Sequence, residues 1–135
     1  MKRTRGLRAI FALTLMALLL ATTMAALAAQ TGTTRRVRFP RGRTTAVLKG
    51  AVVRGTTDRY LLGASAGQTM TVHITSRERN AVFQIYAPGG VALDGAEPGM
   101  DATDWSGDLP QSGDYVIEVG GTRGNASYTL EVTIR

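Results

Sequence analysis

The sequence predicts an all-β protein, a single antiparallel β-sandwich with a jelly-roll-like arrangement of seven or eight short strands. Three observations predict this class. Apolar residues recur at every second position in one short stretch after another, and glycine- and proline-containing turns separate these stretches at short intervals. The third observation is that no stretch after residue 28 has the periodicity of an amphipathic helix.

The alternation is clearest in the second half of the chain. In one stretch Met70, Val72 and Ile74 alternate with polar residues, so one row of side chains can face a core while the other faces water. The same pattern recurs in residues 82–86, 115–119 and 128–134.

The remaining residues are assigned by composition. Residues 37–39, 45–53 and 59–64 are strand-like because they contain β-branched or aromatic residues. Residues 91–108 are rich in glycine and aspartate, and we interpret them as a long loop with one short strand around Trp105.

The first 28 residues have the organisation of a secretory signal peptide. Basic residues come first, an apolar run over residues 9–20 follows, and small residues precede a cleavage site after Ala28, with Ala29 as the second choice. The apolar run is too short for a permanent membrane anchor. We therefore predict export by the general secretory route to the periplasm or outside, with no anchor after cleavage. The predicted divisions are a signal peptide at 1–28, a flexible leader at 29–36 and a β-sandwich domain at 37–135.

Charge and cysteine content exclude several classes of function. The net charge of the whole chain is +6, and four of its basic residues lie in the signal peptide. The mature chain therefore carries about +2, and this charge gives no basis for nucleic-acid binding. Basic residues crowd positions 35–59 and acidic residues positions 94–118, so opposite fields are expected if these parts lie on different faces. The absence of cysteine excludes disulfides and thiol chemistry.

No pattern in the chain predicts an enzyme, a metal site or a cofactor. Ser65 lies in a G-x-S-x-G match, but a strand follows it where a hydrolase needs a helix, so a β-turn is expected there. His73, the one histidine, is expected to face solvent from a strand, without the partners of a triad or zinc site. The acidic residues of 94–108 do not have the spacing of a calcium loop, so we interpret the segment as a solvated acidic loop.

The turn Ser112-Gly113-Asp114-Tyr115 directly precedes a predicted strand. Read from the residues alone, it is a structural hairpin in which Gly113 takes a positive φ and Tyr115 packs inward, with Ser112 on the rim.

Several runs of residues together resemble a known family. The runs Tyr60–Met70 (YLLGASAGQTM), Ala81–Gly89 (AVFQIYAPG), Trp105–Tyr115 (WSGDLPQSGDY) and Ser127–Val132 (SYTLEV) are similar to the bacterial periplasmic inhibitors of g-type lysozyme. They also resemble the bacterial pre-peptidase C-terminal domains, which are β-sandwich modules of secreted enzymes. The resemblance covers residues 39–134, and the AGQTM and SGDY runs favour the inhibitors.

This resemblance implies a function and a binding site. In the inhibitor family a Ser-Gly-x-Tyr loop enters the lysozyme cleft, which implies a g-type lysozyme as protein partner and a partner-binding role for Ser112, Gly113, Asp114 and Tyr115. Arg123, in a glycine-rich hairpin between the last two strands, is the candidate for a nearby guanidinium. The alternative is a carbohydrate- or cell-surface-binding module for peptidoglycan or another polysaccharide, with Trp105 as a sugar platform.

Overall fold

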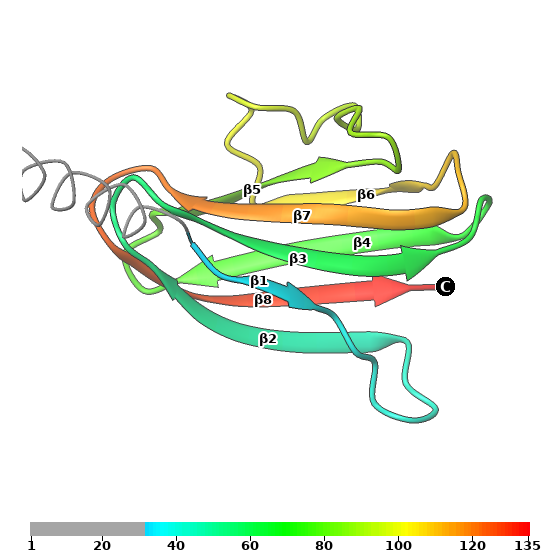
Figure 1. Ribbon diagram of the computed structural model, residues 1–135. Coiled ribbons are helices and arrows are strands. Elements are labelled where there is room, and N and C mark those ends of the chain that lie inside the picture. The colour runs from blue at the N-terminus through cyan, green and yellow to red at the C-terminus, as the bar shows by residue number, and fades with distance from the viewer. Residues whose placement is uncertain (1–31) are drawn as a thin grey trace, which may run out of the picture. The chain divides into compact units, whose positions relative to one another are not determined.

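The computed structural model describes residues 32–135, and every regular element in that part of the chain is a β-strand (Figure 1). The predicted signal peptide and the first residues of the predicted leader lie outside the described residues. Eight strands form two sheets, which confirms the predicted all-β sandwich. The strands are β1 (Thr34–Arg36), β2 (Thr45–Val52), β3 (Thr57–Ala64), β4 (Thr69–Ser76), β5 (Ala81–Tyr86), β6 (Asp104–Asp108), β7 (Gly113–Gly121) and β8 (Ala126–Ile134). Residues 32–135 contain no helix long and apolar enough to span a membrane.

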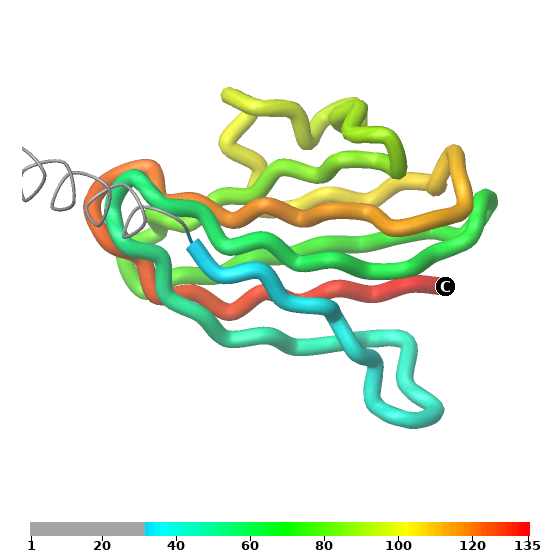
Figure 2. Tube along the Cα trace, in the orientation of Figure 1, coloured from blue at the N-terminus to red at the C-terminus, as the bar shows by residue number. Residues whose placement is uncertain are grey.

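The two sheets have the strand orders β1-β3-β7-β5 and β2-β8-β4-β6. Odd-numbered strands form one sheet and even-numbered strands the other, so every connection crosses between the layers, as the tube in Figure 2 shows. The predicted hairpins before β7 and between β7 and β8 are therefore wrong: each of these turns joins strands of different sheets. All pairings are antiparallel except that of β1 with β3.

The core lies between the two sheets and consists of the alternating residues that the sequence indicates. On β4, Met70, Val72 and Ile74 are buried, whereas His73 between them is exposed. Fully burying one such aliphatic side chain contributes about 1.5–3 kcal/mol, so these rows supply most of the stabilisation of a domain without disulfides. The other strands contribute the buried residues Ala46, Val52, Tyr60, Leu62, Phe83, Ile85, Tyr115, Ile117, Val119, Tyr128, Leu130, Val132 and Ile134.

One polar network is buried in this core. Asp58 is 5% exposed and accepts hydrogen bonds from the Tyr128 hydroxyl (2.7 Å) and from the main-chain and side-chain groups of Thr33 (3.1 and 2.8 Å). The Tyr60 hydroxyl lies 2.5 Å from that of Tyr128 and donates to it, because the proton of Tyr128 is already directed at Asp58. Burial first, and then these hydrogen bonds, raise the pKa of Tyr128 far above its ordinary value, so its hydroxyl remains a donor.

The first strand lies inside the predicted leader. Residues 34–36 pair with β3, and the Val37 amide continues the contact by donating to the Leu61 carbonyl at 2.7 Å. The strand predicted at residues 37–39 is thus displaced toward the N-terminus. Periodicity did not reveal β1 because all three of its side chains are exposed. Backbone hydrogen bonds to β3 and the ion pair of Arg36 with Asp114 hold it at the sheet edge.

The long segment between β5 and β6 covers the other edge of the same sheet. The amide of Ile85 donates to the Ala96 carbonyl (3.0 Å), and that of Leu93 to the Ile85 carbonyl (2.8 Å). Ala96 is fully buried. The prediction of a long loop followed by a short strand containing Trp105 is confirmed.

Basic and acidic segments lie at opposite edges of the sandwich. β1 and the arginines that follow it are at one edge of their sheet, and β5 with the acidic segment after it is at the other. Two ion pairs, Arg36 with Asp114 and Arg59 with Glu118, nevertheless join the basic and acidic parts of the chain across the sheet.

Candidate functional site

The connection between β6 and β7, residues 109–112, lies at one end of the sandwich beside the turn between β3 and β4. We call it the Ser112 turn. The Gly67 amide donates to the Leu109 carbonyl (2.9 Å), and the Leu109 amide donates to the Gln68 carbonyl (2.8 Å). The exposed Ser112 adds a third bond, since its Oγ accepts from the Ala66 amide at 2.9 Å. This bond uses an oxygen lone pair, so the hydroxyl proton of Ser112 remains free to donate outward.

Tyr115 holds this connection from the core side. Its ring is fully buried, and its hydroxyl donates to the Gln111 carbonyl (2.7 Å) while accepting from the Gln111 amide (3.1 Å). The inward orientation expected from the residues is confirmed. Of the four residues implied by the resemblance, Tyr115 is thus the one that is fully buried in this structure, and its hydroxyl holds the main chain of Gln111, next to Ser112.

Gly113 occupies a position that only glycine fits. Its φ is +142°, and a Cβ at this position would lie 2.9 Å from Cγ of Pro88. The positive φ expected from the sequence is confirmed. Both constraints keep the backbone between Ser112 and Asp114 in close contact with the turn that follows β5.

Asp114 of β7 forms a two-point ion pair with Arg36 of the edge strand β1, across the intervening strand β3. The two guanidinium nitrogens lie 3.0 and 2.6 Å from the two carboxylate oxygens, and both side chains are about half exposed. Hydrogen bonding from Arg36 lowers the pKa of Asp114, and the same bond raises the pKa of Arg36. Sequence reasoning missed Arg36 because the pair is 78 positions apart and depends on the parallel pairing of β1 with β3.

Arg123 lies at the other end of the molecule. It belongs to the connection between β7 and β8, so the whole of β7 separates it from Ser112, roughly 30 Å at about 3.3 Å per residue (Figure 1). Its guanidinium donates to the Glu78 carbonyl at 2.8 Å. The structure therefore does not bring Arg123 to the Ser112 turn, and Arg36 is the guanidinium found there.

Three more arginines lie at the same end of the sandwich as Ser112. Residues 37–44, which we call the arginine segment, join β1 to β2 and are fixed at this end by the hydrogen bond from the Ile134 amide to the Thr44 carbonyl (2.9 Å). In Figure 1 the segment is the cyan loop at the lower right. Its three arginines are exposed and take part in none of the ion pairs found in residues 32–135; they are Arg38, Arg41 and Arg43.

The residues that the sequence analysis set aside form no catalytic or metal site. Ser65 is in a β-turn where its amide donates to Gln68 Oε1 (2.8 Å), as expected. His73 is exposed on β4 and pairs with Asp104 of β6. Asp108 accepts from the Thr69 hydroxyl at 2.8 Å. The part of the chain that the structure describes holds no group of three or more metal-binding side chains.

Trp105, the candidate sugar platform, is tied to the loop that precedes β6. The indole is partly buried against the core, and its N–H donates to the Asp94 carbonyl at 2.9 Å. A Cβ on Gly107 would lie 2.8 Å from the ring, so the indole lies flat along its own strand. Through these contacts Trp105 fixes the acidic loop, and its role in carbohydrate binding stays a prediction.

Comparison with known proteins identifies the family. No protein-family model and no curated protein sequence matches the chain. Among solved structures, Aeromonas hydrophila PliG, described as a periplasmic lysozyme inhibitor of g-type lysozyme, is 36% identical with a TM-score of 0.66. The match covers 78% of this chain and 99% of that one. The chain belongs to the PliG family.

Other structures agree with the PliG assignment. PliG of Salmonella Typhimurium (TM-score 0.60) and a mutant of Escherichia coli PliG (TM-score 0.59) are each 25% identical over 77% of this chain and 99% of theirs. The pre-peptidase C-terminal domain of a Bacillus anthracis collagenase, 12% identical with a TM-score of 0.54 over 77% of this chain and 96% of that one, shares the fold alone. The PliG structures are those of inhibitors, which confirms the prediction that this chain is not an enzyme.

Proposed function

We propose that this protein is a periplasmic inhibitor of a g-type lysozyme and that it acts by inserting the Ser112 turn into the active-site cleft of the enzyme. The observation that carries the proposal is the 36% identity to a solved inhibitor over 99% of that inhibitor's chain. In support of it, the turn lies at one end of a rigid sandwich and ends in the exposed Ser112, directly before β7.

The chemistry of the turn suits a cleft lined with carboxylates. Glycoside hydrolases use paired acidic residues at the reacting bond, so a blocking group needs hydrogen-bond donors. The hydroxyl proton of Ser112 is directed to no acceptor within the turn, whereas its oxygen is fixed by the Ala66 amide. A donor held on a preorganised turn binds a carboxylate with little loss of conformational entropy.

The charges at this end of the molecule support the same partner. Arg36 neutralises Asp114, so the turn does not present an isolated negative charge to an acidic cleft. The arginine segment adds three unpaired positive charges at the same end. Such a field accelerates association with an acidic surface and weakens as ionic strength rises.

Delivery to the periplasm is part of the proposal. Residues 1–28 act as the signal peptide for the general secretory route, with cleavage after Ala28. N-terminal sequencing of the protein recovered from the periplasmic fraction tests this step. A chain that begins at Ala29 supports it, and an uncleaved chain contradicts it.

The function is tested by adding purified residues 29–135 to a g-type lysozyme in a cell-wall lysis assay. Lysis slows in proportion to inhibitor concentration, and Ser112→Ala weakens the effect. The matched control is Ser127→Ala, which removes an exposed hydroxyl on β8 close to the opposite end. Lysis that continues unchanged at micromolar excess of the wild-type protein contradicts the proposal.

A further inference from the structure

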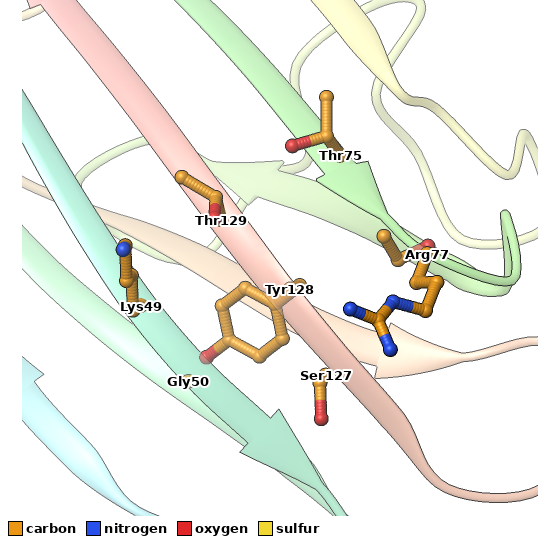
Figure 3. Close-up of a pocket in the computed structure, with 8 residues that line it drawn as sticks. Lys49, Gly50, Thr75, Arg77, Ser127, Tyr128 and Thr129 are labelled. Atoms are coloured by element: carbon orange, nitrogen blue, oxygen red, sulfur yellow. The ribbon is translucent and has the colours of Figure 1, made fainter.

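A depression on the outer face of the second sheet lies near the end opposite the Ser112 turn. It has a volume of about 510 Å³ and is open to solvent. Figure 3 shows its lining side chains, which come from the neighbouring strands β2, β8 and β4 and from Arg77, the residue directly after β4. The side chains that carry the argument are Lys49, Thr75, Arg77, Ser127 and Thr129.

Strand register brings these groups together. Lys49 pairs with Thr129, and Thr129 pairs with Thr75, so the three form one row across β2, β8 and β4. Neighbouring strands are about 4.8 Å apart, which places the lysine and the far threonine backbones on opposite sides of β8, roughly 10 Å from each other. Arg77 follows β4, and in Figure 3 its guanidinium extends toward β8 near Ser127.

The lining is positively charged and has no carboxylate. Lys49 and Arg77 take part in none of the ion pairs of residues 32–135. Glu131, the next outward-facing residue of β8 after Thr129, is opposite His73 and does not line the depression. Two unpaired cations therefore flank a row of hydroxyl groups without a resident counter-charge.

The strands that carry the depression are anchored to the core. Gly50 and Tyr128, which also line it, pair across β2 and β8. A Cβ on Gly50 would lie 2.4 Å from the Tyr128 hydroxyl oxygen, so glycine is required for the ring to reach the buried Asp58. The flanking Ser127 and Thr129 are thus mounted on a strand fixed by the core, which is the kind of support that a binding site needs.

We propose that this depression binds a phosphate group. A guanidinium, an ammonium and several hydroxyl donors line one depression without a carboxylate, and they match the charge and the acceptor oxygens of phosphate. The site is roughly 25 Å from the Ser112 turn along the strands, so a phosphate-bearing ligand and a protein at the turn can be held at once. The phosphate comes either from free inorganic phosphate or from the headgroup of an anionic lipid.

The test is a titration of ¹⁵N-labelled protein with inorganic phosphate at constant ionic strength. Amides of residues 75–77 and 127–129 shift along saturating curves, and Lys49→Gln with Arg77→Gln weakens the fitted affinity at least tenfold. The matched control, Arg38→Gln with Arg43→Gln, removes the same charge at the other end and leaves the affinity unchanged. Shifts that do not saturate, or that are equal in both double variants, overturn the proposal.

A second experiment identifies the source of the phosphate. Phosphatidylglycerol vesicles, with phosphatidylcholine vesicles as reference, are sedimented with the wild-type protein and the two double variants. Binding to the anionic vesicles that the Lys49/Arg77 variant loses and the control keeps assigns the site to a lipid headgroup. Saturable phosphate binding without vesicle binding assigns it to the free ion. Equal lysozyme inhibition by the Lys49/Arg77 variant and the wild type separates this site from the proposed inhibitory turn.

Discussion

Buried polar groups at one end of the sandwich and the exposed turn at the other end use their hydrogen bonds in opposite ways. In the interior of the end that carries Arg123, polar groups are bonded to one another: Asp58 is buried among hydroxyls, and the Asn80 side chain, 2% exposed, donates to the carbonyls of Arg123 (3.1 Å) and Asn125 (2.9 Å). At the other end Ser112 is exposed and keeps a free donor. Substitutions of these buried groups should therefore change stability, whereas substitution of Ser112 should change partner binding.

The largest expected effect lies beneath the Ser112 turn and qualifies this contrast. Tyr115→Ala leaves a cavity in a fully buried site and lowers the free energy of unfolding by about 3–5 kcal/mol, as for other large aromatic residues. Tyr115→Phe keeps the ring, removes the two bonds to Gln111 and costs about 1 kcal/mol. Urea denaturation measures both variants. Equal losses in the two would contradict the role assigned to the ring.

At the opposite end, the buried carboxylate supplies the next effect. Asp58→Ala leaves the Tyr128 hydroxyl and the Thr33 groups without their acceptor and lowers the free energy of unfolding by about 2–4 kcal/mol. Lysozyme inhibition by the folded fraction stays unchanged. Thr57→Ala, at the exposed neighbouring position, is the control for denaturation. A loss of inhibition without a loss of stability would reverse the assignment of this end.

Ser112→Ala separates binding from stability most clearly. It removes the proposed donor to the lysozyme and weakens inhibition about tenfold or more, which corresponds to about 1.4 kcal/mol. Because Ser112 is exposed, the lost bond to Ala66 lowers the free energy of unfolding by less than about 1 kcal/mol. Inhibition constants and urea denaturation, measured on the same preparation, check both parts. A variant that inhibits like the wild type shows that the hydroxyl is not part of the contact.

The ion pair of Arg36 with Asp114 beside the turn predicts a weak dependence of stability on pH. Arg36 lowers the pKa of Asp114, so the stabilisation is complete above the ordinary aspartate pKa and is lost as pH falls through the lowered value. Asp114→Asn removes this part of the acid sensitivity and is less stable than the wild type at neutral pH. Melting temperatures from about pH 6 to about pH 2.5 measure the difference, which becomes smaller in high salt. Parallel pH curves for the two proteins would show that the pair does not contribute.

The smallest expected effect is at Arg123. Arg123→Gln removes an exposed hydrogen bond to the Glu78 carbonyl far from the Ser112 turn, so inhibition stays within the error of the assay. The reference variant is Arg36→Gln, which leaves Asp114 unpaired and weakens inhibition. A strong loss of inhibition in Arg123→Gln alone would place the lysozyme contact at the Arg123 end and contradict the proposed role of the Ser112 turn.

Sequence reasoning succeeded where a local pattern specifies burial. The alternation of Met70, Val72 and Ile74 identified the inward face of β4, and the same rule predicted the inward position of Tyr115. The positive φ of Gly113 followed from turn chemistry. These properties depend on neighbours in the chain, which a single sequence contains.

The errors concern contacts between distant segments. Alternation tells which face of a strand is buried but not which strand lies beside it, so turns that cross between the sheets were interpreted as hairpins. For the same reason Arg123 was expected near Ser112, while Arg36, which meets Asp114 through β1, was assigned to a leader. An edge strand with every side chain exposed has no apolar signal to detect.

The most direct test of the account is amide hydrogen exchange on residues 29–135 mixed with a g-type lysozyme. The account predicts that exchange slows in the two neighbouring connections, 65–68 and 109–115, and stays unchanged in residues 122–125. Slower exchange at 122–125 with none at 109–115 would contradict it, because the Arg123 end would then hold the enzyme.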